Sequence, residues 1–119
     1  MRHEESTLQI GCVDWFRTHY PDLVIMAIPN GGNRNIVTAA IMKREGVLAG
    51  AGDLFLTFAS HGYHGLWIEM KTKKGKQSES QKEFQKKQER LGYKYVVCRS
   101  FQDFKEEIEN YIQDETGIH

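Results

Sequence analysis

The sequence contains few residues that would fix a structure covalently. Only two of its 119 residues are cysteine and two are proline. Cys12 and Cys98 lie far apart and belong to no Cys-x-x-Cys pair, which argues against a disulfide scaffold and a zinc knuckle. We therefore expect two reduced thiols in the core.

Long apolar runs are also absent. The longest uncharged stretch, residues 23–33, is short and is interrupted by Pro29 and two glycines, so it cannot cross a bilayer. The first ten residues carry charges where a signal peptide needs an apolar run. We expect a cytoplasmic protein with no membrane partner.

The chain has no net charge, because sixteen Lys and Arg residues balance sixteen Asp and Glu residues. The distribution is nevertheless uneven. Residues 71–94 contain nine basic residues against three glutamates, a net charge of +6, whereas residues 103–119 contain six acids against Lys105, a net charge of −5. The basic segment could bind a polyanion, and a solvated helix with mixed charges is the alternative.

Hydrophobic spacing predicts an α/β fold in a single domain spanning residues 1–119, with 39% apolar residues to form its core. The predicted helices cover residues 4–20, 35–45, 78–91 and 100–112. The predicted strands cover residues 23–28, 53–59, 66–71 and 93–99. This order, α-β-α-β-β-α-β-α, is typical of a mixed central sheet of about four strands flanked by helices.

Glu5 is an acidic residue on the predicted apolar face of the first helix. Leu8, Cys12 and Phe16 recur at intervals of four, and Glu5 falls within the same stripe at 100° per residue. An acid that faces a core is costly unless it is paired or binds a cation, so Glu5 is a candidate for chemistry. The alternative is a carboxylate favoured at the helix start by the macrodipole.

The two strands at residues 53–59 and 66–71 read as an antiparallel hairpin. Side chains alternate along a strand, so Glu69 and Lys71 share the face opposite to Met70. With the turn near residues 62–63, Asp53 would lie roughly opposite residue 72. A β-bulge could shift this pairing by one or two residues.

Asp53, Glu69 and Lys71 are the residues most indicative of chemistry. Two converging carboxylates make a hard oxygen site that suits Mg²⁺ or Mn²⁺. A lysine on the same face could orient or deprotonate a water, or neutralise charge as a phosphate is attacked. Without further context, the alternative is a solvated ion pair between strands.

The pattern Asp53…Glu69-Met70-Lys71 resembles the PD-(D/E)xK nuclease signature, with Gly52 where some members have proline. Four features in order resemble the VRR-NUC family over about residues 3–112. They are Glu5, Pro29-Asn30-Gly31-Gly32, Gly46-Val47-x-x-Gly50-x-x-Asp53-Leu54, and Ile68-Glu69-Met70-Lys71 followed by Gly75, Ser78 and Gln81.

The resemblance implies a restriction-endonuclease-like fold and a metal-dependent phosphodiesterase of the type found in stand-alone phage and bacterial proteins. It implies that Asp53 and Glu69 bind the metal through their side chains and Met70 through its backbone carbonyl. Lys71 would be the catalytic lysine, and Glu5 would hold a metal-bound water. Gln81 would support the site, although it also fits a capping box with Ser78.

Several other residues have weaker functional signals. His61 and His64 have the spacing of a metal pair but are expected at an exposed turn. Trp15 and Trp67 are expected in a core or an interface. Gly50 and Gly52 lack the lysine of a P-loop, so no nucleotide cofactor is expected.

Together these features predict a Mg²⁺- or Mn²⁺-dependent endodeoxyribonuclease, with a non-catalytic nucleic-acid-binding module as the alternative. The expected DNA contacts come from Arg34, Lys73, Lys74, Lys76, Lys82 and Lys86. One metal site cuts one strand at a time, so we expect a homodimer for symmetric cutting of duplex or branched DNA such as a Holliday junction. Trp15, Trp67 and Tyr63 are its candidate interface residues.

Overall fold

The computed structural model describes residues 2–29 and 35–113. The elements follow the predicted order. They are α1 (Arg2–His19), β1 (Ile25–Ala27), α2 (Ile36–Arg44), β2 (Leu54–Leu56), β3 (Leu66–Met70), α3 (Glu79–Arg90), β4 (Lys94–Cys98) and α4 (Phe101–Ile112). The strands are shorter than predicted, because ladder pairing extends over only three residues in β1 and β2.

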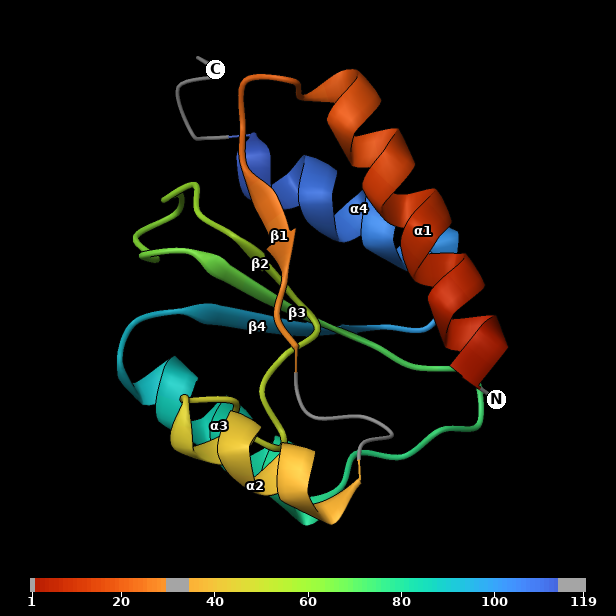
Figure 1. Cartoon of the computed structure of the whole chain (residues 1–119). Coiled ribbons are helices and arrows are strands. Elements are labelled where there is room, and N and C mark those ends of the chain that lie inside the picture. The colour runs from red at the N-terminus through yellow and green to blue at the C-terminus, as the bar shows by residue number, and fades with distance from the viewer. Residues whose placement is uncertain (1, 30–34, 114–119) are drawn as a thin grey trace.

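The four strands form one mixed sheet in the order β1-β2-β3-β4. The two pairings on either side of β2 are antiparallel, and β3 pairs with β4 in parallel. In Figure 1, α1 and α4 lie together over one face of this sheet, and α3 covers the other. The predicted mixed α/β architecture is confirmed.

The two faces of the sheet differ in what they bury. Leu66, Ile68 and Met70 of β3 join the main core beneath α1 and α4. The opposite face carries a smaller cluster of Ala51, Phe84 and Tyr95. Because side chains alternate along β3, Trp67 and Glu69 point to this second face, as predicted for Glu69.

The register of the β2–β3 hairpin differs from the predicted one. Leu54 lies opposite Ile68, so Asp53 comes beside Glu69 rather than opposite residue 72. The turn is centred on His61 and Gly62, which have positive φ angles of 54° and 82°, one residue earlier than predicted. In addition, residues 57–59 make the β2 side of the loop one residue longer. The shift places the two acids next to each other.

The ends of three helices are fixed by side-chain caps. Asn35, Ser78 and Ser100 accept hydrogen bonds from backbone N–H groups in the first turns of α2, α3 and α4. At α3, Ser78 and Gln81 form the complete capping box that the sequence predicted. Helix α3 is thereby anchored directly after the strand that carries Glu69.

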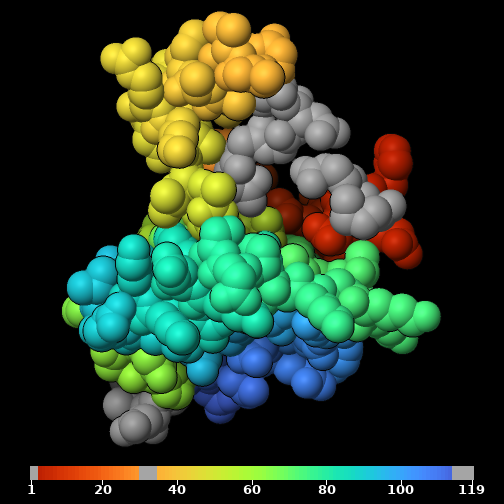
Figure 2. All heavy atoms as spheres, turned by 90° about the horizontal axis from the view of Figure 1, so that it is seen from below, coloured from red at the N-terminus to blue at the C-terminus, as the bar shows by residue number. Residues whose placement is uncertain are grey.

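Helix α2 stands out from the body of the protein in Figure 2. It contains no buried residue, and Ile36 and Val37 are 87% and 70% exposed. The chain after it is closely packed at Gly50, where an added Cβ would lie 2.7 Å from the backbone of Ser80. The large apolar side chains Ile36, Val37 and Ile41 of this helix are therefore exposed.

Cys12 and Cys98 are free, fully buried thiols, as predicted. Burial raises the pKa of Cys12 to about 11 and that of Cys98 to about 12, so both stay protonated at neutral pH. In the described parts of the chain, no helix combines the length and the apolar composition needed to cross a membrane.

Candidate active site

Asp53 stands at the start of β2, with its carboxylate fixed by the neighbouring strand. Its Oδ2 accepts a hydrogen bond of 2.6 Å from the backbone N–H of Met70, and its own N–H donates to the carbonyl of Ile68. These two bonds hold the side chain across β3 at the position of Glu69.

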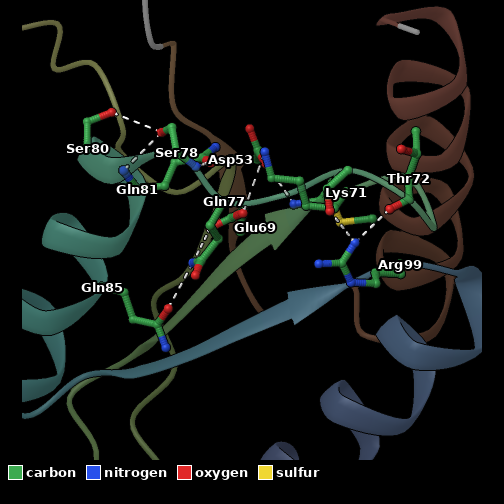
Figure 3. Close-up of polar contacts among 12 residues, drawn as sticks. Asp53, Glu69, Lys71, Thr72, Gln77, Ser78, Ser80, Gln81, Gln85 and Arg99 are labelled. Carbon is green, nitrogen blue, oxygen red and sulfur yellow. Dashed lines mark hydrogen bonds and ion pairs between the residues drawn. The ribbon is translucent and has the colours of Figure 1, made fainter.

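Glu69 is completely buried in the middle of the sheet. Its Oε1 accepts a hydrogen bond from the Tyr95 hydroxyl at 2.6 Å. The same oxygen accepts a second hydrogen bond from Nε2 of Gln77 at 2.9 Å (Figure 3). Its Oε2 is also buried but has no hydrogen-bond partner among the described residues. One oxygen of this carboxylate is thus fully engaged and the other is available.

Lys71 follows β3 and lies on the same face as Glu69, as predicted. Its Nζ is 3.8 Å from Oε2 of Glu69, and its side chain is only 13% exposed. Its backbone N–H donates to the carbonyl of Cys98, which ties the end of β3 to β4. The ammonium group is therefore held against the carboxylates rather than in solvent.

Asp53 has a raised pKa in this environment. Burial is the main cause, and the negative charges of Glu69 and Glu5 add to it, while the Met70 N–H and the Lys71 ammonium oppose it. The net shift of the pKa is upward, because burial and the two neighbouring carboxylates outweigh the Met70 N–H and the Lys71 ammonium. A bound cation would oppose that shift.

Glu5 reaches the same region from α1. It is half-buried and lines, with Asp53, a cleft of about 600 Å³ between α1 and β1. Its charge is close enough to raise the pKa of Asp53. The inward placement predicted from the helix periodicity is confirmed, and the carboxylates of Glu5 and Asp53 line the same cleft.

The donor set fits a hard divalent cation. The groups that could bind it are all oxygens: the buried Oε2 of Glu69, which accepts no hydrogen bond among the described residues, the Asp53 carboxylate and the backbone carbonyl of Met70. Across residues 2–29 and 35–113, no three His, Cys, Asp or Glu side chains converge closely enough to hold a metal by themselves. Water and backbone oxygens would therefore complete the coordination, as is usual for Mg²⁺.

The side chain of Gln81 is occupied by the helix cap. Its Oε1 accepts from the backbone N–H of Ser78 at 2.8 Å, while the backbone N–H of Gln81 donates to the Ser78 hydroxyl. Of the two roles open to it from sequence, the structure places it in the capping box (Figure 3). Gln77, four residues earlier, makes the contact with Glu69.

Sequence reasoning missed both Gln77 and Tyr95. The contact of Tyr95 with Glu69 depends on the parallel register of β3 and β4, which places Tyr95 opposite Trp67. A buried tyrosine two positions before the partner of Glu69 is a signal only once that register is known.

Arg99 shapes the loop that carries the first predicted DNA contacts. Its Nη1 donates to the carbonyls of Thr72 at 2.8 Å and Gly75 at 2.6 Å (Figure 3). The side chains of Lys73, Lys74 and Lys76 on this loop are exposed, as are Lys82 and Lys86 on α3. The remaining predicted contact, Arg34, lies outside the described residues.

The two histidines of the hairpin and the two tryptophans make contacts within the fold. His61 and His64 are exposed at the hairpin end, as predicted, and His61 Nε2 lies 2.6 Å from the carbonyl of Gln113. Trp67 donates to Gln88 and packs edge-on against Phe84. Trp15 packs among the aromatic rings of α1 and α4.

A mixed sheet that aligns an aspartate on one strand with Glu-x-Lys on the next defines the class of restriction-endonuclease-like nucleases. The VRR-NUC domain profile matches residues 2–102, and the chain therefore belongs to the VRR-NUC domain family. A solved structure described as a VRR_NUC domain protein is similar to this chain, with a TM-score of 0.76 and 29% sequence identity. The likeness covers 91% of this chain and 87% of the other.

No curated protein matches the sequence. Membership in the VRR-NUC family implies a nuclease-type function, with DNA as the substrate. The resemblance noted from the motifs is thereby confirmed at the level of the family and the fold.

We expect Asp53→Asn to raise the melting temperature of the metal-free protein by a few degrees at neutral pH. The pKa of Asp53 is raised on folding, so the ionised carboxylate destabilises the fold once the pH exceeds the unfolded-state pKa of about 3.9. The penalty grows as the pH rises through the folded-state pKa and is absent at lower pH. Asparagine can still accept the Met70 N–H.

Thermal unfolding in EDTA, at neutral pH and near the unfolded-state pKa, measures this effect. The stabilisation should shrink on acidification, and Asp22→Asn at an exposed position should show none. An Asp53→Asn protein that melts no higher than the parent at neutral pH contradicts the expectation.

Proposed function

We propose that this protein is a Mg²⁺- or Mn²⁺-dependent endodeoxyribonuclease. The observation that carries the proposal is the buried Oε2 of Glu69, which accepts no hydrogen bond among the described residues, lies 3.8 Å from the Lys71 ammonium and is on the same face as Asp53. A buried carboxylate oxygen that accepts no hydrogen bond costs free energy unless something binds it. A divalent cation meets that requirement, and its chemistry is that of phosphodiester hydrolysis.

Asp53, Oε2 of Glu69 and the Met70 carbonyl would hold the cation. When bound, the cation lowers the pKa of a water and offsets the negative charge of the phosphate. Lys71 orients the attacking water or stabilises the charge that develops on the phosphate oxygens. Glu5, which lines the cleft together with Asp53, would accept a hydrogen bond from a water bound to the cation.

The hydrolysis needs these groups and water, and no further reactant. A bond forms between the water oxygen and phosphorus while the bond from phosphorus to the leaving oxygen breaks. The leaving oxygen ends protonated, and the new phosphate monoester remains near Lys71 and the exposed lysines of the loop. No nucleotide or redox cofactor enters this reaction.

We expect cleavage of DNA in Mg²⁺ or Mn²⁺ and little cleavage in Ca²⁺ or EDTA. Small hard ions bind water in octahedral geometry and acidify it, whereas Ca²⁺ accepts looser coordination. Asp53→Ala and Glu69→Ala should each reduce turnover to background while DNA binding persists, since both remove a ligand and also a repulsive charge. Glu106→Ala, an exposed acid on α4, is the matched control.

Turnover of labelled DNA under single-turnover conditions measures this loss. Cleavage that is undiminished by EDTA, or wild-type turnover by either variant, would refute the metal site. DNA binding without cleavage by the parent protein would instead support the alternative, a non-catalytic nucleic-acid-binding module on a nuclease fold.

We expect the basic loop and α3 to bind the phosphate backbone. Replacing Lys73, Lys74 and Lys82 by glutamine should weaken binding to every DNA sequence, because phosphate contacts carry no base information. The log–log slope of affinity against salt should flatten by about 0.9 for each lost contact on duplex DNA. Lys105→Gln on α4 should leave the slope unchanged, and an unchanged slope for the triple variant would place these lysines in solvent.

We also propose a homodimer that acts on branched DNA, since two strands need two sites related by a two-fold axis. Trp15 and Trp67 are half-buried within one chain and offer little contact area, and Tyr63 is 36% exposed. The exposed face of α2 is larger, with Ile36, Val37 and Ile41 all more than half exposed. This face is therefore the better candidate interface.

A double variant, Ile36→Glu with Ile41→Glu, should convert a dimer to a monomer by placing charge on that face. Light scattering at micromolar concentration measures the mass, and mapping of cuts on a fixed four-way junction measures paired incision. Leu91→Glu, an exposed leucine at the end of α3, is the control. A parent protein that is strictly monomeric and nicks linear strands as readily as junctions is inconsistent with the dimer.

A further inference from the structure

Glu69 has two oxygens in different environments, and this difference bears on which cation the site can hold. We propose that Tyr95 and Gln77 are positioning residues that restrict Glu69 to binding through one oxygen, and that they thereby favour Mg²⁺ or Mn²⁺ over Ca²⁺. The inference rests on the metal site proposed above and concerns how that site discriminates between ions.

Oε1 of Glu69 is saturated by its two donors. A carboxylate oxygen has two lone pairs, and here they face the Tyr95 hydroxyl at 2.6 Å and the Gln77 amide at 2.9 Å. A cation bound by both oxygens would need to displace these donors within a fully buried site. Only Oε2, which has no such donor among the described residues, is available as a ligand.

Tyr95 can act towards Glu69 only as a donor. It is buried on β4, and its ring meets the ring of Phe84, which limits its movement. A phenol keeps its proton at neutral pH, so the hydroxyl has a hydrogen to donate. An ionised carboxylate has only acceptor sites, and the hydrogen bond therefore has one direction.

The amide of Gln77 is oriented by a chain of hydrogen bonds along α3. Nε2 of Gln85 donates to Glu89, which as a carboxylate can only accept. Oε1 of Gln85 is then free to accept from Nε2 of Gln77, whose second hydrogen is directed at Glu69. Glu89 at one end of this series of hydrogen bonds and Glu69 at the other can both only accept. The Nε2 group of Gln77 is therefore the end of its amide that faces the site.

Coordination through one oxygen selects for small ions. Ca²⁺ takes six to eight oxygens and commonly binds a carboxylate through both, whereas Mg²⁺ requires near-octahedral geometry with single oxygens and retained waters. A site in which Glu69 supplies one oxygen has fewer protein ligands than Ca²⁺ needs. Freeing Oε1 should therefore help Ca²⁺ more than it helps Mg²⁺ or Mn²⁺.

The test measures binding of Mn²⁺ and Ca²⁺ to the full chain without DNA. Electron paramagnetic resonance gives the free Mn²⁺ concentration, and calorimetry gives the affinity for Ca²⁺. The variants are Tyr95→Phe, which keeps the ring, and Gln77→Leu, which keeps the size of the side chain. Tyr93→Phe and Gln102→Leu, which change the same groups at positions outside these contacts with Glu69, are the matched controls.

We expect Tyr95→Phe and Gln77→Leu each to weaken Mn²⁺ binding about tenfold, which is typical when a hydrogen bond to a metal ligand is lost. Ca²⁺ binding should stay the same or strengthen, so the preference for Mn²⁺ over Ca²⁺ falls about tenfold or more. The controls should keep the preference of the parent protein. Two variants are used so that a folding defect in one, seen as a lower melting temperature, leaves the other decisive.

The outcomes separate this inference from the proposed function. If the parent binds Mn²⁺ and a folded variant keeps the same preference, the role of Tyr95 and Gln77 is overturned and the metal site stands. If the parent binds neither ion, the proposed metal site itself is wrong, and the inference falls with it. Equal losses for Mn²⁺ and Ca²⁺ would show a purely structural role and would also overturn it.

Discussion

The burial of the Glu69 carboxylate is the constraint on which the rest of the site depends. A charge placed in the middle of a sheet is costly, and here its compensation comes from three directions. Tyr95 donates from β4, Gln77 donates from the loop before α3, and Lys71 places an ammonium 3.8 Å away from the chain just beyond β3. The parallel pairing of β3 with β4 is what brings the tyrosine within reach of the acid.

One face of the sheet forms the main apolar core, and the other face carries the buried acid of the candidate site. Beneath α1 and α4 the contacts are apolar, and this face buries Phe16, Phe104 and Ile108 completely. The face toward α3 combines a small apolar cluster with the polar groups around Glu69. Helix α1 contributes to both the core and the candidate site, because Cys12 and Phe16 pack in the core while Glu5 lines the cleft beside Asp53. A change in how α1 packs would therefore also move the Glu5 carboxylate.

Local patterns in the sequence predicted what depends on neighbouring residues alone. Alternation placed Glu69 and Lys71 on one face, and the capping box at Ser78 fixed the start of α3. The predicted register of the hairpin was wrong by three residues, for two reasons. The turn comes one residue earlier than predicted and uses His61 with a positive φ of 54°, a conformation that histidine does not indicate as glycine or asparagine would. In addition, residues 57–59 make the β2 side of the loop one residue longer. Gln77 and Tyr95 were not predicted as site residues for a different reason. Their contacts with Glu69 arise from strand pairing and from the path of a loop, which no local sequence pattern contains.

The hydrogen bonds of Arg99 constrain the length of the loop between β3 and α3. Its guanidinium spans the carbonyls of Thr72 and Gly75 from the end of β4, where the neighbouring Cys98 carbonyl accepts the N–H of Lys71. The loop is therefore attached to β4 at both its start and its middle. One residue more or fewer between Thr72 and Gly75 would carry a carbonyl out of reach of the guanidinium. A related chain with a loop of another length must consequently support its lysines with a different set of contacts.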